Sequence, residues 1–176
     1  MPRVSLVEKD QAHPTYREIY QGQEERGFRV LNIIKVLAHC PKIGLNYQRL
    51  AGSVLRGENV PANLRELATL RVGNLAQAEY EFSHHVPLAL RAGVSQKQID
   101  ELSDWATSAE FNDQERAVLS YTDEVARDNK VTDDTFAKLR SFFSEHDIVE
   151  LTILIGYFVM LCRILIALQI ELEPEP

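Results

Sequence analysis

The chain contains very little cysteine. Only Cys40 and Cys162 occur among its 176 residues, which excludes the disulfide framework typical of small secreted proteins. No Cys-x-x-Cys pair is present, so the sequence offers no redox dithiol. Cys40 follows His39, but neighbouring residues on a helix do not face each other, and we interpret Cys40 as an ordinary packing residue. Cys162 lies in the most apolar run of the chain, which predicts core packing.

Basic residues are also in the minority. The chain carries 19 Lys and Arg against 26 Asp and Glu, for a net charge of −7, and its basic residues are scattered. Nucleic-acid binding requires a dense positive patch that displaces counterions from phosphates, so we expect no nucleic-acid partner. The first ten residues lack the apolar core of a signal peptide, which favours a cytoplasmic protein.

Motifs that hold common cofactors are missing as well. The sequence has no Gly-rich phosphate loop, no Gly-x-Ser-x-Gly elbow and no kinase signature. We therefore expect no bound cofactor.

Long hydrophobic runs are limited to one. The run begins at Leu151 and is uninterrupted for about a dozen residues, whereas a bilayer requires about 20. Glu150 and Arg163 bracket it, and Arg163 would fall inside any longer span that continued to Ile170. The pattern indicates a helix buried on nearly all sides rather than a membrane span.

No stretch alternates cleanly enough to predict a strand, and nearly every long segment has a helical period. Pro41 and Pro61 are typical first residues of helices. Ser95 with Gln98, and Asn112 with Glu115, have the spacing of capping boxes. Pro87 predicts a kink or a break. We expect a single compact all-α domain of about eight helices and at least 60% helix over residues 1–176, with residues 1–27 as an N-terminal extension.

The segment from Glu66 to His85 carries most of the chemistry. Glu81 and His85 are four residues apart, so on one helix both lie on the same face. A carboxylate beside an imidazole in apolar surroundings is a pair whose protonation can be tuned near neutrality. Glu66 precedes Glu81 by a distance of roughly 22 Å along a continuous helix. The three residues can meet only if the chain bends between them, and Gly73-Asn74 through Gln77 is the expected bend.

Two other interpretations of this segment stay open. Glu81-Phe-Ser-His84 has the Glu-x-x-His spacing of di-iron bundles, but no credible second motif exists, and Asp10-Gln-Ala-His13 only imitates one. We expect no metal. The second alternative is a helical oligomer whose polar cluster is structural and binds a small ligand or metal without turnover. A cavity that reaches Glu66 and His85 would favour catalysis, and a solid core would favour the structural role.

These residues resemble those of the carboxymuconolactone decarboxylase family, whose relatives include alkylhydroperoxidase D. The resemblance covers most of the chain from about residue 28 onward. The segments that carry it are 37–41, 64–68, 78–93 and 155–165. It implies an alkylhydroperoxidase D-like all-helical fold and assembly into dimers, trimers or hexamers.

The peroxidase branch of that family has a Glu, eleven residues, a Cys-x-x-Cys, three residues and a His. In this chain the Glu falls on Glu66 and the His on His85, whereas the cysteine positions hold Ala78 and Glu81. Without thiols no dithiol can reduce a hydroperoxide, so we do not carry over the antioxidant peroxidase activity, although it is the family-level alternative. The departure is typical of the decarboxylase-like branch.

The resulting hypothesis is an acid–base enzyme, a decarboxylase-like lyase, that acts on a small carboxylated or lactone-type compound. His85 would move the proton, Glu81 would orient the imidazole, and Glu66 would be a second acid or base. An acidic substrate also needs a cation, and Arg71 is the nearest candidate in the sequence. Tyr80 and His84 complete the predicted substrate-binding residues.

The final helix predicts self-assembly. From Ile148 to Leu168 apolar residues fill consecutive positions, so they point in every direction around the helix. The domain's own core can cover one face, and a second copy of the chain is the simplest cover for the rest. We expect a homo-oligomer with this helix or the Val30–Leu55 hairpin at the interface.

Overall fold

The structure is a computed structural model that describes residues 2–174, and it is all-α. These residues form nine α-helices, one short 3-10 helix and one π-helical turn, with no strand among them. Helices account for 68% of the described residues. The expected fold class and the expected helix content are confirmed, with one α-helix more than the number expected from the sequence.

The chain divides into two compact units. The first contains the described parts of residues 1–53 and 165–176, and the second contains residues 54–164. The helices α3 (Pro41–Arg56) and α9 (Glu145–Leu168) each contribute residues to both units. The single domain expected over residues 1–176 stays a prediction, and each unit is described by itself below.

The first unit is built around two tyrosines of α1 (Pro14–Glu24). Tyr16 and Tyr20 are fully buried, pack edge to face and contact partly buried residues of α2 (Asn32–Leu37). The Tyr20 hydroxyl donates to the Val7 carbonyl at 2.9 Å. The expected N-terminal extension, residues 1–27, therefore supplies part of the core of this unit.

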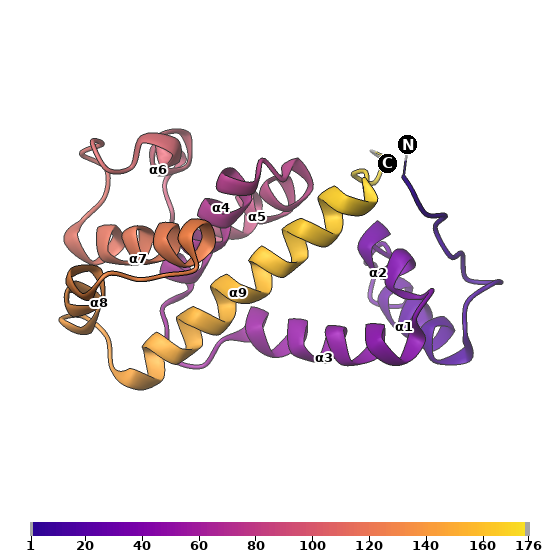
Figure 1. Ribbon diagram of the computed structural model, residues 1–176. Helices are drawn as coiled ribbons and strands as arrows, with labels where there is room; N and C mark the ends of the chain where they lie inside the picture. Colours follow the sequence, from indigo (N-terminus) through magenta and orange to yellow (C-terminus); the bar gives the residue numbers. More distant parts are fainter. Residues whose placement is uncertain (1, 175–176) are drawn as a thin grey trace. The chain divides into compact units, whose positions relative to one another are not determined.

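The second unit carries the candidate site, and α4 packs against both α5 and α7 in it (Figure 1). The remaining elements are α4 (Ala62–Ala76), α5 (Glu79–Arg91), α6 (Gln96–Asp100), the 3-10 helix Leu102–Asp104, α7 (Asp113–Asp123), the π-helical turn Glu124–Asp128 and α8 (Asp133–Arg140). Leu64, Leu67 and Leu70 of α4 are almost completely buried. This apolar packing fixes α4 in place as the element that positions the site.

Local sequence signals place the helix ends. Both expected capping boxes are present. The side chains of Ser95 and Asn112 each accept from the backbone N–H three residues later, and their own backbone N–H groups donate to the side chains of Gln98 and Glu115. Pro41 and Pro61 stand at the starts of α3 and α4. Of the kink or break expected at Pro87, the break is absent, because α5 continues through this residue to Arg91.

The bend between Glu66 and His85 lies at Gln77 and Ala78. Helix α4 continues through Gly73 and ends where Gln77 adopts the left-handed conformation at φ 54°. The bend therefore falls at the far end of the expected range. Gly73 faces α5, and a Cβ added there would make an ordinary contact of 3.5 Å with the Phe82 nitrogen.

Helix α9 is, by length and composition, the one described helix that could cross a membrane. The core helix of a soluble protein passes the same test, and 44% of the most apolar window of α9 is buried inside the protein. Leu151, Ile155 and Phe158 are among its buried residues. The cytoplasmic location expected from the sequence stays a prediction.

Candidate functional site

Glu66, His85 and Glu81 form one hydrogen-bonded triad. The Glu66 Oε2 atom of α4 lies 2.8 Å from His85 Nδ1, and the Glu81 Oε1 atom of α5 lies 3.0 Å from His85 Nε2. Glu81 and His85 are one helical turn apart, and the bend after α4 returns the chain so that Glu66 faces them. The expected convergence of the three residues is confirmed, whereas their catalytic role stays a prediction.

The three side chains differ in their access to solvent. Glu81 is 5% exposed and His85 is 7% exposed, whereas Glu66 is 18% exposed. Glu66 Oε2 is bonded to the imidazole, and Oε1 has no hydrogen-bond partner among the described residues. The triad therefore has a closed end at Glu81 and a more open end at Glu66.

The two carboxylates hold a proton on His85. Burial lowers the pKa of His85, but hydrogen bonds from the imidazole to Glu66 and Glu81, together with their charges, raise it to about 9. At neutral pH the ring is an imidazolium whose two N–H groups each donate to a carboxylate. Neither ring nitrogen is left to contact a substrate directly.

Residues of α9 cover the imidazole. The Phe158 ring packs edge to face against His85 with its centroid 5.0 Å away. Cys162 lies one turn further along α9 and is buried. Burial, together with the charge of Glu81, raises the pKa of the Cys162 thiol to about 12. The thiol stays protonated at neutral pH and is a poor nucleophile there.

Tyr80 and His84 form a separate pair on α5. Their rings stack with centroids 4.4 Å apart, and His84 Nδ1 lies 2.8 Å from the Tyr80 carbonyl oxygen, so this nitrogen donates. Their predicted substrate-binding role is neither supported nor opposed by this contact.

The Arg71 side chain points to Asp123 of α7. Its guanidinium binds both carboxylate oxygens of Asp123 on α7, at 2.6 and 2.8 Å. Nη1 also donates to Asn74 Oδ1 and to the Leu102 carbonyl, both at 3.0 Å. These bonds occupy the planar fork of the side chain. The structure thus brings Arg71 to Asp123, and its expected contact with an acidic substrate stays a prediction.

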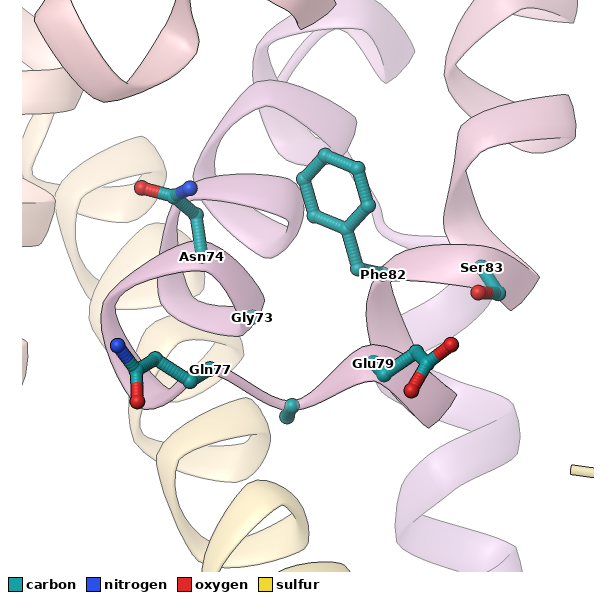
Figure 2. A pocket seen from close by; sticks show the side chains of 7 residues that line it. Gly73, Asn74, Gln77, Glu79, Phe82 and Ser83 are labelled. Atoms are coloured by element: carbon teal, nitrogen blue, oxygen red, sulfur yellow. The ribbon is translucent and has the colours of Figure 1, made fainter. Parts of the chain in front are cut away.

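A shallow cavity of about 350 Å³ lies at the corner between α4 and α5 (Figure 2). Asn74 and Gln77 line it from the α4 side, and Glu79, Phe82 and Ser83 line it from α5. The triad residues are not among its lining residues. A second cavity of similar size lies in the first unit and is lined by charged residues such as Lys9, Glu24 and Lys35.

No group of three or more His, Cys, Asp or Glu side chains within residues 2–174 is arranged to hold a metal ion. In the triad the reason is geometric, because each imidazole nitrogen points at a carboxylate oxygen rather than sharing an open position with it. In the Glu-x-x-His pair, Glu81 bonds to His85, and His84 Nδ1 bonds to the Tyr80 carbonyl.

Comparison with known proteins identifies the family. Residues 41–124, which contain the whole triad, match the sequence model of the carboxymuconolactone decarboxylase family. The chain belongs to the carboxymuconolactone decarboxylase/AhpD-like superfamily. No curated protein matches the chain.

Solved structures of other proteins share the fold. A protein of unknown function from Agrobacterium tumefaciens, suggested to be the antioxidant defence protein AhpD, is 26% identical, with a TM-score of 0.73 over 78% of this chain and 94% of that one. An uncharacterised peroxidase-related protein with an AhpD core, from Ralstonia eutropha JMP134, is 18% identical, with a TM-score of 0.84 over 98% and 92%. The debrominase Bmp8, as a cysteine-to-alanine variant with 2,3,4-tribromopyrrole, is 22% identical, with a TM-score of 0.81 over 97% and 91%.

The main difference from the peroxidase branch lies at the turn after α4, where this chain has no cysteine. Ala78 precedes α5, and Glu81 lies in its first turn. The family resemblance stated above places the two cysteines of the peroxidase branch at these positions. Glu81 is bonded to His85, so a carboxylate takes the place of a sulfur next to the imidazole. Of the two cysteines in the chain, Cys40 is exposed and Cys162 is buried, and their positions in the sequence do not have the Cys-x-x-Cys spacing.

Two contacts of the site were not expected from the sequence. Phe158 lies 73 positions after His85, and Asp123 lies 52 positions after Arg71. Neither has a local motif that would point to its partner. The only signal available for Asp123 is that Arg71 lies in an apolar helix, so a buried guanidinium requires a carboxylate somewhere in the fold.

Proposed function

We propose that the protein is an acid–base enzyme that transfers a proton to or from carbon in a small organic compound, with lactone-type compounds as first candidates. Family membership supports an enzymatic role. The observation that carries the proposal is the continuous Glu66–His85–Glu81 hydrogen-bond chain, which is closed at Glu81 and more open at Glu66. Such a chain can store and return a proton near neutral pH.

Glu66 is the residue that we assign to contact the substrate. Both imidazole nitrogens are engaged, which argues against the direct proton delivery by His85 expected from the sequence. Glu66 would accept a proton from a carbon next to a carbonyl group, and the electron pair left behind would move onto the carbonyl oxygen. The proton on Glu66 then exchanges with solvent, and delivery of a solvent-derived proton from Glu66 to the same carbon completes the exchange. His85 and Glu81 act as positioning residues that stabilise the charge of Glu66.

Hydrogen–deuterium exchange tests this proposal without a known product. A panel of lactones is incubated with the protein in D₂O, and loss of the protons next to the carbonyl is followed by NMR. The Glu66→Gln variant keeps the shape and an acceptor for the imidazole but not the base, so we expect a rate loss of about 10²-fold or more. Glu79→Gln is the matched control on the exposed side of α5. Equal rates for wild type and Glu66→Gln would contradict the assignment.

Thiol chemistry is a less supported alternative. The neighbouring debrominase and peroxidase-related proteins are similar to this chain at 22% and 18% identity, which carries the fold but not a reaction. The Cys162 pKa is raised to about 12, and the positions of the redox pair hold Ala78 and Glu81. We therefore propose proton transfer rather than peroxide reduction or dehalogenation.

A non-catalytic role is the second candidate, and one observation favours it. Both imidazole nitrogens of His85 are bonded inside the protein, one to Glu66 and one to Glu81. A structural triad predicts that the exchange experiment is negative for every compound, and that Glu66→Gln changes stability only.

We also propose that a second copy of the chain covers α9. Val149 is 58% exposed and Ile153 is 51% exposed, and Met160 lies on the same side of the helix. A Cβ added at Gly156, between them, would meet nothing within 4 Å. A row of exposed apolar side chains interrupted by a glycine allows a helix of a second copy to pack closely against α9. Light scattering should give a multiple of 20.1 kDa, and Ile153→Glu should shift the mass toward one chain. A monomeric wild type at micromolar concentration would contradict this proposal.

A further inference from the structure

We infer that the cavity of the first unit binds a small zwitterion, such as a free amino acid. The cavity has a volume of about 350 Å³, which lies in the range of sites for small molecules. All the residues that line it belong to the first unit, whereas the triad belongs to the second. A ligand site there therefore goes beyond the proposed function.

Four of the charged side chains around this cavity are already paired with one another. Lys9 Nζ lies 2.5 Å from Glu24 Oε2, and Lys35 donates to both carboxylate oxygens of Glu8, at 2.8 and 2.9 Å. Each pair has no net charge. These four residues therefore favour neither an anionic nor a cationic ligand.

Arg29 supplies a positive charge that is not paired in this way. Its Nη2 atom donates to the Pro174 carbonyl at 2.6 Å, and no Asp or Glu side chain of residues 2–174 forms an ion pair with it. The remaining N–H groups of a guanidinium can hold a carboxylate through two parallel hydrogen bonds. Arg29 is thus the positive pole of the cavity.

Asn32 supplies a buried acceptor on the same cavity. The residue is only 8% exposed, its Nδ2 donates to the Glu171 carbonyl at 2.9 Å, and its backbone N–H donates to Glu173 Oε1 at 2.6 Å. Its Oδ1 atom accepts no hydrogen bond from any residue that the structure describes. A buried amide oxygen without a donor is costly, so an N–H group of a ligand would stabilise it. The Glu173 carboxylate beside Asn32 favours a donor with a positive charge.

The two poles are close enough for one small molecule. Arg29 and Asn32 are three residues apart, so their Cα atoms lie within about 11 Å of each other. Both are also bonded to the segment 171–174. A carboxylate at Arg29 and an ammonium group at Asn32 are the two ends of an amino acid. A simple acid or a simple amine would satisfy only one pole.

Three probes with the same carbon skeleton test the inference at pH 7. Phenylalanine has both charged groups, 3-phenylpropionate lacks the ammonium group, and phenethylamine lacks the carboxylate. Their phenyl group suits the apolar wall that Tyr20 and Val30 contribute to the cavity. Each probe is titrated into ¹⁵N-labelled full-length protein, and the backbone amide signals of Val30 and Asn32 give its affinity by NMR.

We expect phenylalanine to bind about tenfold more tightly than either of the other probes, because it alone satisfies both poles. Arg29→Gln removes the positive pole and should weaken phenylalanine binding about fivefold to tenfold, with phenethylamine binding unchanged. Arg26→Gln is the matched control, since Arg26 is exposed and does not line the cavity. This variant should leave all three affinities unchanged.

Three results would overturn the inference. They are the absence of saturable phenylalanine binding, equal affinities for phenylalanine and 3-phenylpropionate, and a phenylalanine affinity that Arg29→Gln does not change. Thermal unfolding of each variant shows that it is folded, and the order of the three probes on the wild type decides the question without any variant. A negative hydrogen–deuterium exchange experiment would end the enzymatic proposal and leave this inference intact.

Discussion

Helix α4 anchors two buried ionic clusters that are built from similar parts and differ in their chemistry. Glu66 pairs with His85 and, through it, with Glu81, whereas Arg71 pairs with Asp123. Both clusters join α4 to a neighbouring helix, α5 in the first case and α7 in the second. Their central cations, His85 and Arg71, are both almost completely buried.

The difference lies in the cation. A guanidinium keeps its charge at every pH that a protein tolerates, so the Arg71–Asp123 pair has one state and serves as a fixed link. An imidazolium can release its proton, and the raised pKa of His85, about 9, places that change within an accessible range. The two clusters are therefore alike in burial and pairing, and they differ in the ability to titrate.

Breaking the fixed link should have the largest effect on stability. Arg71→Met leaves Asp123 and the Leu102 carbonyl without their shared donor, and we expect a loss of about 3–5 kcal/mol in the free energy of unfolding. The loss should be nearly constant between pH 6 and 9, because Arg71 does not titrate there. Urea unfolding at several pH values checks this. A loss that changes steeply across that range would show that the cluster is not a fixed link.

Breaking the titratable cluster should have a smaller, pH-dependent effect. A folded-state pKa raised from 6.5 to about 9 contributes stability that is fully present below pH 6.5 and is lost as the pH rises through 9. His85→Gln should therefore cost about 3 kcal/mol near pH 6, and the gap to the wild type should narrow toward pH 9.5. Urea unfolding of both proteins at pH 6, 7.5 and 9.5 measures the gap. A gap that stays constant or widens with pH would contradict the charged state assigned to His85.

Only part of the difference between the two clusters could be predicted from the sequence. The four-residue spacing of Glu81 and His85 places both on one face, and the Gly73–Gln77 stretch indicates a bend, so the triad could be expected. Capping boxes and prolines likewise located most helix ends. These are local features, and local geometry is what a single sequence encodes most directly.

What the sequence did not reveal depends on contacts between distant segments. Arg71 was expected near the triad because it is close in sequence, but a helix turns its successive residues to different faces, and Arg71 faces α7 instead. The occupation of both imidazole nitrogens could not be foreseen either, since it depends on the angle between α4 and α5. The number of compact units depends on long-range contacts as well.

Removing the carboxylates of Glu66 and Glu81 one at a time tests whether they hold the proton on His85. Glu66→Gln and Glu81→Gln each take away one charge that holds the proton on His85, so the pKa of His85 should fall from about 9 by about one unit or more in each variant. An NMR titration of the His85 ring signals measures the shift. The control Glu79→Gln should leave the midpoint unchanged. Unchanged midpoints in both triad variants would show that the carboxylates do not hold the proton.

We expect the smallest effect at Gln77, in the turn that ends α4. This turn brings Glu66 close to His85, whereas the Arg71–Asp123 link does not depend on it. Gln77 holds φ at 54°, a left-handed conformation that a side chain with a Cβ adopts at a cost. Gln77→Gly should relieve this cost and raise the free energy of unfolding by about 0.5–1 kcal/mol. Ser83→Gly, inside α5, is the control and should lower it by a similar amount. Urea unfolding at pH 7 measures the change in the free energy of unfolding for both variants. Destabilisation by Gln77→Gly would mean that the glutamine side chain stabilises the corner, and the left-handed turn would then be favoured rather than strained.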